Sequence, residues 1–257
     1  KGMPPDVGDY KQVTPLGVCS SAECAALLID AGADVNAGFL DGNCPLSVTC
    51  ITGNLSTAEM LLQRGADPNT LAPDMVPLLH MCVERGNLLM ARLLIEHGVN
   101  INMRCHSRNG ITALHLAVSL DMEDAVRLLL EMGANPDAFN SEGRTPLHIL
   151  GGNKDTRLAE LLLNHGADPN CTDINGISLL SMAIMHDNLP LAKLLLEHGV
   201  DPNKGKAYQL PLDEAMAARN NGFGDNAMIE LLKQYGAKTV AELDAEKKAA
   251  SSPLRVN

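Results

Sequence analysis

Residues 143–170 begin with "GRTPLHIL" (143–150) and end with "LAELLLNHGADPN" (158–170). In the first motif, Thr145 suits a helix N-cap, and Pro146 suits the first helical turn, where its missing N–H costs nothing. In the second motif, leucines at helical spacing predict a helix that ends at Gly166, because glycine readily takes the left-handed conformation found just past a helix end. The stretch therefore predicts two short helices followed by an extended segment.

The same pattern recurs along most of the chain. Glycines equivalent to Gly166 are separated by 33, 33, 35, 33, 33 and 37 residues, and they are Gly32, Gly65, Gly98, Gly133, Gly166, Gly199 and Gly236. A second series runs nearly in phase with Pro146, and its members are Pro15, Pro45, Leu78, Ala113, Pro146, Leu179 and Pro211. A period of this length indicates a repeat protein, in which each unit buries its apolar face against its neighbours.

On these recurring motifs, residues 14–237 resemble ankyrin repeats. The resemblance implies an all-α repeat solenoid, which is a stack of helix-turn-helix units with projecting β-hairpin fingers. We expect the ankyrin repeat domain to cover residues 1–238, with repeats at approximately 6–37, 38–70, 71–103, 104–138, 139–171, 172–204 and 205–238. Residues 239–257 are expected to form a short C-terminal helix and a flexible tail.

In ankyrin repeats, the histidine that follows Thr-Pro-Leu typically hydrogen-bonds within and between neighbouring units. His148 and His115 match that position, and His80 matches it after a one-residue shift that puts Pro77 in the place of threonine. A second series stands directly before the helix-ending glycines, where a cation suits the helix C-terminus, and comprises His97, His165 and His198. We expect both series to be structural.

Repeats 1 and 5 are among the repeats that depart from the pattern. Pro15 to Gly32 is 17 positions, against 20 from Pro146 to Gly166, so the first helix of repeat 1 is expected to stop near Ser20–Ser21. Repeat 1 is either a degenerate cap or the cut end of a longer array. In repeat 5, the glycines of "LGGNKD" (150–155) replace helix formers at about 1 kcal/mol each, so this unit should be the weakest in the middle of the stack.

The composition limits the classes of function. The chain has 257 residues, of which 46% are hydrophobic and 20% charged, the balance of a globular protein. A formal net charge of −11 disfavours nucleic acid, whose phosphates require a basic surface, and the apolar runs are too short to cross a bilayer. No set of nucleophile, base and orienting residue stands out. We therefore expect no enzyme, no catalytic residue, no cofactor and no membrane insertion.

The seven cysteines are Cys19, Cys24, Cys44, Cys50, Cys82, Cys105 and Cys171. Their number is odd, and they lack the paired short spacing of a zinc site. The Cys105–His106 pair supplies at most two of the four ligands that a structural zinc ion needs. We expect reduced core thiols, no metal site and a cytoplasmic location, with the nucleus as the alternative.

Solenoids commonly bind partners on a concave surface, which the resemblance builds from the fingers and the first helices. Apolar residues recur in successive fingers, and such a row indicates an interaction stripe, unless some of them fold down between adjacent fingers. The candidate partner-binding residues, called the predicted stripe below, are Leu40, Asp41, Ile51, Leu71, Asp74, Val76, Glu84, Arg85, Arg108, Ile111, Leu120, Phe139, Glu142, Arg144, Ile174, Ile177 and Met185.

Asn36 is a candidate modification site. It ends "LIDAGADVN" (28–36), which resembles the target of the asparaginyl hydroxylase that modifies ankyrin domains. Such a modification is a property of the fold and does not define a function.

The leading hypothesis is a noncatalytic scaffold or adaptor that binds one partner protein or peptide on its concave finger and inner-helix surface. The negative charge favours a partner with basic patches, through steering more than affinity, and we expect the chain to be monomeric by itself. The alternative is a targeting or regulatory section of a larger multidomain protein, such as a ubiquitin-ligase, kinase or zinc-finger protein, whose activity lies outside this chain. A third hypothesis is a structural spacer without a specific ligand.

Overall fold

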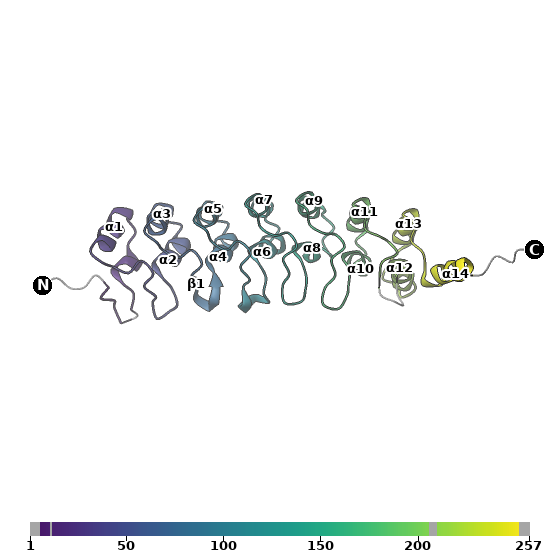
Figure 1. The fold of residues 1–257 in the computed structure, drawn as a ribbon, viewed down its shortest axis with the longest axis horizontal. Coiled ribbons are helices and arrows are strands. Elements are labelled where there is room, and N and C mark those ends of the chain that lie inside the picture. Colours follow the sequence, from purple (N-terminus) through teal and green to yellow (C-terminus); the bar gives the residue numbers. More distant parts are fainter. Residues whose placement is uncertain (1–5, 11, 206–209, 252–257) are drawn as a thin grey trace, which may run out of the picture. The chain divides into compact units, whose positions relative to one another are not determined.

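The computed structural model describes residues 6–10, 12–205 and 210–251. The chain divides into two compact units, residues 1–141 and residues 142–257. Each unit contains pairs of antiparallel helices linked by extended fingers (Figure 1). The predicted flexible tail, with Ser252–Pro253, lies outside the described residues.

The first unit holds two rows of helices. The first helix of each pair is η1 (Pro15–Val18), α2 (Pro45–Thr52), α4 (Leu78–Glu84) or α6 (Ala113–Ser119). The second is α1 (Ala22–Asp30), α3 (Leu55–Gln63), α5 (Leu88–Glu96) or α7 (Glu123–Glu131). Helix α2 packs between η1 and α4, and α4 packs on α6, while α3 packs between α1 and α5, and α5 packs on α7. The short η1 confirms that the first helix of repeat 1 is truncated.

Fingers connect each second helix to the next first helix. In the finger at residues 66–77, β1 (Leu71–Ala72) pairs antiparallel with β2 (Val76–Pro77), and η2 (Pro73–Met75) closes the hairpin. In the next finger, at residues 99–112, η3 (His106–Arg108) lies between the bridged residues Cys105 and Ile111. The predicted β-hairpin finger is thus confirmed in its shortest form.

The second unit repeats the arrangement. Its first helices are α8 (Pro146–Ile149), α10 (Leu179–Met185) and α12 (Pro211–Asn220), and its second helices are α9 (Arg157–Asn164), α11 (Leu189–Glu197) and α13 (Asn226–Gln234). Helix α10 packs on α8, α11 and α12, and α13 packs on α11 and α12. Helix α14 (Val240–Ser251) follows the last pair. Helix α8 has only four residues because Gly151 and Gly152 follow it, where other repeats have helix formers.

One leucine in each second helix from α3 to α13 is fully buried. These leucines carry the repeat period into the core, and they are Leu61, Leu94, Leu129, Leu162, Leu195 and Leu232. Full burial of a leucine side chain contributes roughly 1.5–3 kcal/mol. The same core layer is therefore rebuilt in each repeat from the second to the seventh, whereas the outward-facing side chains can differ.

Candidate protein-interaction surface

The histidines after the helix N-caps are structural, as predicted. His148 Nδ1 accepts a hydrogen bond from the Thr145 N–H at 3.2 Å and lies 2.8 Å from the Thr145 hydroxyl. His115 makes the same pair of contacts with Thr112, at 3.2 and 2.9 Å. Each histidine therefore closes the N-terminal turn of its own helix.

His80 makes a different contact, because its N-cap is Pro77, which has neither an N–H nor a hydroxyl. Its Nε2 lies 2.9 Å from the carbonyl oxygen of Ile111 in the next finger, while its buried Nδ1 has no hydrogen-bond partner in the described residues. The histidines before the helix-ending glycines bond the carbonyl oxygen four residues earlier, at 2.8–3.0 Å, and these are His97, His165 and His198. They bond carbonyl oxygens in the last turns of α5, α9 and α11.

The prediction of core thiols holds for four of the seven cysteines. Cys82 fills in α4 the fully buried position that Ala117 fills in α6, and Cys44, Cys50 and Cys105 are also buried. The prediction is wrong for Cys24, which is exposed because the next residue of α1, Ala25, faces the core instead. Cys19 and Cys171 are half-buried. No group of three His, Cys, Asp or Glu side chains in the described part of the chain is placed to hold a metal ion.

In the first unit, part of the predicted stripe is exposed. Leu40, Ile51, Leu120 and Phe139 present apolar side chains to solvent, and Phe139 is 59% exposed. Leu71 and Ile111 are half-buried. Val76 was predicted wrongly, since it is only 8% exposed. It pairs with Ala72 across the hairpin, and both side chains are buried.

Two of the charged residues predicted in the first unit form a salt bridge with each other. Arg108 and Glu84 form a bidentate salt bridge, with Nη1–Oε1 at 3.0 Å and Nη2–Oε2 at 3.1 Å, and the Glu84 carboxylate raises the pKa of Arg108. Asp41 uses its carboxylate to hold Asn43 within its own finger. Asp74 and Arg85 are exposed.

In the second unit, Ile174 and Met185 are exposed, and Ile177 is half-buried. Ile177 and Met185 line a hollow of about 380 Å³ between α10 and α12, with Ile184 and Glu214 among the other lining residues. This hollow has an apolar floor and one carboxylate, and it lies along the first helices, where the sequence placed the binding surface.

Arg144 and Glu142, also predicted, form a salt bridge at 3.0 Å. Arg144 Nε lies 3.8 Å from the buried carboxylate of Asp173. Burial opposes ionisation of Asp173, but hydrogen bonds from the N–H groups of Ile177 and Asn175 outweigh it and hold the pKa of this carboxyl below its usual value. Sequence reasoning missed Asp173, although "TDINGIS" (172–178) differs from the other fingers in placing an acidic residue there.

Met75 is the second residue that sequence reasoning missed. It is 64% exposed at the tip of the finger 66–77, where the aligned residues of four other fingers are Gly42, Gly110, Gly143 and Gly176. The available signal was the absence of glycine at this position between two fingers that have it.

Asn36 is exposed, and its side chain joins two repeats. Its Nδ2 donates to the Gly65 carbonyl oxygen at 3.2 Å, and its Oδ1 accepts from the Asp67 N–H at 2.9 Å. Asn203 repeats this arrangement with Gly236 and Lys238. The amide of Asn36 therefore braces the stack, and its modification stays a prediction.

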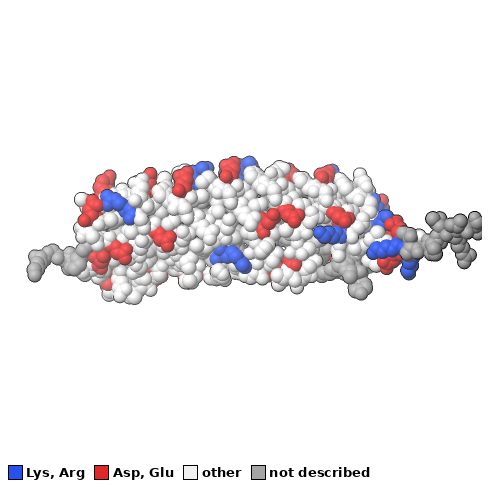
Figure 2. All heavy atoms as spheres, in the orientation of Figure 1, with Lys and Arg blue, Asp and Glu red and all other residues white. Residues whose placement is uncertain are grey.

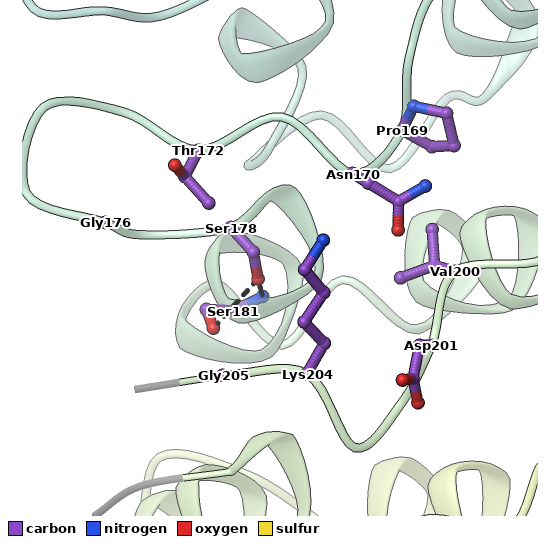
Figure 3. A pocket seen from close by; sticks show the side chains of 10 residues that line it. All are labelled: Pro169, Asn170, Thr172, Gly176, Ser178, Ser181, Val200, Asp201, Lys204 and Gly205. Atoms are coloured by element: carbon purple, nitrogen blue, oxygen red, sulfur yellow. Dashed lines mark hydrogen bonds between the residues drawn. The ribbon is translucent and has the colours of Figure 1, made fainter. Parts of the chain in front are cut away.

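A smaller hollow lies in the second unit between the bases of two fingers (Figure 3). The hydroxyls of Ser178 and Ser181, 3.1 Å apart, line it together with the side chains of Lys204 and Asp201. Its volume of about 110 Å³ is below the range of about 300–1,000 Å³ that is usual for small-molecule sites. None of the helices in the described residues is long and apolar enough to cross a membrane.

Comparison with known proteins agrees with this architecture. Residues 79–173 and 149–243 match the family description "Ankyrin repeats (3 copies)", and residues 41–72 match "Ankyrin repeat". Rabankyrin-5 from Homo sapiens and from Mus musculus are each 54% identical to this chain over 43 residues, which is 17% of the chain and 4% of the length of those relatives.

Two solved structures resemble the fold over most of the chain. The ankyrin repeat domain of Bcl-3, described as a unique member of the IkappaB protein family, has a TM-score of 0.73 and 28% identity, covering 86% of this chain and 98% of that one. An ankyrin repeat domain from Acinetobacter baumannii AYE has a TM-score of 0.65 and 22% identity, covering 76% and 98%, and at this identity it shows the fold alone.

The ankyrin repeat fold is a noncatalytic interaction domain, and ankyrin repeats are generally protein–protein interaction modules. The matched residues, the helix pairs and the finger turns all follow the same period. The chain belongs to the ankyrin repeat family.

Proposed function

We propose that this chain is a noncatalytic scaffold or adaptor that binds a partner protein or peptide through its first helices and fingers. The proposal builds on the general role of ankyrin repeats as interaction modules. It adds which surface is used, and it predicts that binding depends on apolar side chains that the fold leaves in solvent.

The observation that carries the proposal is the exposure of Phe139. Aromatic residues make up 2% of the chain, which has three phenylalanines and no tryptophan. Phe39 is buried, as core packing favours, whereas Phe139 is exposed in a finger. Aromatic side chains contribute strongly to interface energies, and more than half of the Phe139 side chain is left in solvent in the free protein.

Leu120 supports the same reading. It is the C-cap residue of α6 and is exposed, as Ile51 is near the end of α2. Single exposed apolar residues are common, but here they recur at the C-terminal ends of first helices within one unit. In the second unit, the exposed Met185 occupies the comparable place as the last residue of α10, and Ile174 is exposed in the preceding finger.

The partner is proposed to carry basic patches. The formal net charge of −11 attracts a basic surface and raises the association rate more than the final affinity. We also propose a reducing compartment, the cytoplasm or nucleus, in which the four buried thiols stay reduced.

The test is affinity capture from cell lysate with quantitative mass spectrometry. The variant Leu120→Glu/Phe139→Glu places two charges in the predicted stripe. The matched control is Leu89→Glu, because Leu89 is 67% exposed but lies on a second helix, α5. Circular dichroism and thermal unfolding establish first that all three proteins are folded.

We expect a small set of proteins to be captured by the wild type and by Leu89→Glu but lost with the double variant. Direct titration of those proteins with the purified chain then measures affinity. Equal recovery by all three baits would show that the first-helix and finger surface is not the binding site.

A second candidate function is that the chain is a targeting or regulatory section of a larger protein. It is favoured by the curated relatives, of whose length the match spans only 4%. Under this proposal an adjoining module, such as a ubiquitin ligase, kinase or zinc finger, supplies the activity. Sequencing the complete reading frame on both sides of this chain distinguishes the two.

A further inference from the structure

A groove in the first unit differs in charge from the rest of the molecule. It lies between the finger 66–77 and the finger 99–112 and has a volume of about 530 Å³. Leu71, Met75 and Met103 supply its apolar lining, Arg104 supplies a positive charge and His106 an imidazole, and asparagines complete the lining. Asp and Glu are absent from the residues that line it, whereas each of four other hollows compared with it has at least one carboxylate.

This charge pattern is unusual for so acidic a chain, which has 31 Asp and Glu against 20 Lys and Arg. On the face drawn in Figure 2, acidic side chains, with basic ones beside some of them, recur over the second helices of each unit, while the tips of the fingers are largely uncharged. A positively charged, carboxylate-free groove in such a molecule selects for an occupant of negative charge.

Arg104 is held in place by neutral groups. Its Nε donates to the Gly110 carbonyl oxygen at 3.1 Å, and its Nη2 lies 3.4 Å from the Ser141 hydroxyl. It forms no salt bridge with a carboxylate in the described residues, unlike Arg108, which is paired with Glu84. The guanidinium of Arg104 is therefore fixed in direction by neutral groups, and no carboxylate of the described residues neutralises its charge.

Met75 projects an apolar side chain at the tip of one wall. Its φ of +58° lies in the left-handed region, next to Asp74 at +60°, and the aligned glycines of the neighbouring fingers, Gly42 and Gly110, have φ of +82° and +67°. A side chain other than glycine is unfavourable in this conformation, so the finger retains methionine at a cost to its own stability. Methionine is adaptable and well suited to a binding surface.

Hydrogen bonds between neighbouring fingers also fix the walls of the groove in the free protein. Asn69 Oδ1 accepts from the Asn100 N–H at 2.7 Å, which joins the bases of the two fingers, and Asn102 Oδ1 accepts from the Asn135 N–H at 2.8 Å. Walls fixed in this way lose little conformational entropy on binding.

We propose that this groove binds an acidic peptide segment of a partner protein, with one bulky apolar side chain seated against Met75, Met103 and Leu71. Aspartates or glutamates on either side of that anchor pair with Arg104 and His106. The groove shares Leu71 with the predicted stripe, but Met75, Met103, Arg104 and His106 lie outside that stripe, and neither Leu120 nor Phe139 lines the groove. The two proposals are therefore tested by different variants, and either can fail without the other.

The probe is a fluorescein-labelled twelve-residue peptide with a central Leu-Phe pair flanked by glutamates, compared with the same peptide flanked by lysines. Binding is followed by fluorescence anisotropy and by the ¹H–¹³C signals of the methionine methyl groups. We expect the acidic peptide to shift the Met75 and Met103 signals selectively, and its affinity to fall steeply with added salt. The lysine-flanked peptide should bind at least about tenfold more weakly.

Three variants test the assignment. Arg104→Glu should weaken the acidic peptide about tenfold or more, whereas Arg92→Glu makes the same change of net charge on α5, outside the groove, and should leave affinity within about twofold. Met75→Gly removes the anchor contact and relieves the backbone strain. It should therefore reduce affinity about tenfold or more in a protein that is folded at least as stably.

Several results would overturn the proposal. These are equal binding of the two peptides, absence of binding up to millimolar concentration, or unchanged affinity in both Met75→Gly and Arg104→Glu. Sedimentation velocity that shows a Met75-dependent dimer would assign the groove to a second copy of the chain instead. Met75-dependent cosedimentation with phosphatidylserine vesicles, without peptide binding, would assign it to a membrane surface.

Discussion

Thr145 and His148 are hydrogen-bonded at the start of α8. His148 Nδ1 accepts from the Thr145 N–H at 3.2 Å and lies 2.8 Å from the Thr145 hydroxyl. Pro77 cannot make either contact with His80, and His80 Nδ1 is left buried without a partner in the described residues. Helix α4 therefore lacks the N-terminal cap that α6 and α8 have, although its histidine is present.

Replacing Pro77 by threonine should restore the cap. An N-cap threonine contributes about 1 kcal/mol, and the restored partner for His80 Nδ1 adds to this, while loss of the proline raises the entropy of the unfolded chain by about 0.4–1 kcal/mol. We expect Pro77→Thr to raise the free energy of unfolding by about 0.5–1 kcal/mol, measured by urea titration. Pro77→Ala, which removes proline without adding a hydroxyl, should not be stabilising.

Met75→Gly should stabilise the protein on its own. The left-handed conformation destabilises the folded state by about 1–2 kcal/mol when the residue is not glycine. Glycine removes this cost, but its greater backbone freedom stabilises the unfolded state by about 0.5–1 kcal/mol. A net gain of about 0.5–1 kcal/mol is expected in thermal or urea unfolding. Met75→Ala keeps the strained Cβ and is the control. A loss of stability in Met75→Gly would show that packing of the methionine side chain stabilises the folded protein by more than the backbone strain costs.

The fold could be predicted from the sequence because the helix-capping residues and the core leucines both recur with the repeat period. Thr145 before Pro146, and the glycine that ends each second helix, mark the helix ends. The fully buried leucines, such as Leu162, recur with the same period. Local signals and core packing agree in most repeats, so one register satisfies both.

The sequence did not predict which apolar finger residues are exposed and which are buried. Leu40 and Val76 are both apolar finger residues, but Leu40 is exposed and Val76 is buried. The difference depends on the path of the hairpin, which in this finger is altered by left-handed Asp74 and Met75. Side-chain direction in a two-residue strand is set by such details and not by composition.

Asp173 is expected to stabilise its finger in a pH-dependent manner. Its Oδ1 accepts from the N–H groups of Asn175 at 2.8 Å and Ile177 at 3.0 Å, and the pKa of the carboxyl is lowered in the folded protein. A lowered folded-state pKa means that the stabilisation is present above the unfolded value, near 3.8, and is lost as pH falls through the folded value.

Asp173→Ala should therefore cost about 1–3 kcal/mol at pH 7, because two partly buried N–H groups lose their acceptor. The difference from the wild type should shrink as the pH is lowered below about 4. Urea titrations at both pH values measure this, and Asp244→Ala on exposed α14 is the control. A deficit that is unchanged at low pH would mean that the side chain acts by packing and not as a carboxylate.

Two buried histidines should make the fold sensitive to mild acid. Burial lowers the pKa of both His80 and His148 below the ordinary value of 6.5. As pH falls below 6.5, the unfolded chain therefore takes up protons that the folded protein does not, and stability falls until the lower folded pKa is reached. Each histidine can contribute a slope of up to about 1.4 kcal/mol per pH unit in that window.

The measurement is the urea midpoint of unfolding at several pH values between 7.5 and 5. In His80→Gln/His148→Gln the midpoint should depend less on pH than in the wild type, even though the variant is less stable throughout. His106→Gln, which removes an exposed imidazole, should keep the wild-type dependence. If the double variant kept the full dependence instead, the acid sensitivity would have to come from other groups, and these two imidazoles would be protonated as readily in the folded state as in the unfolded one.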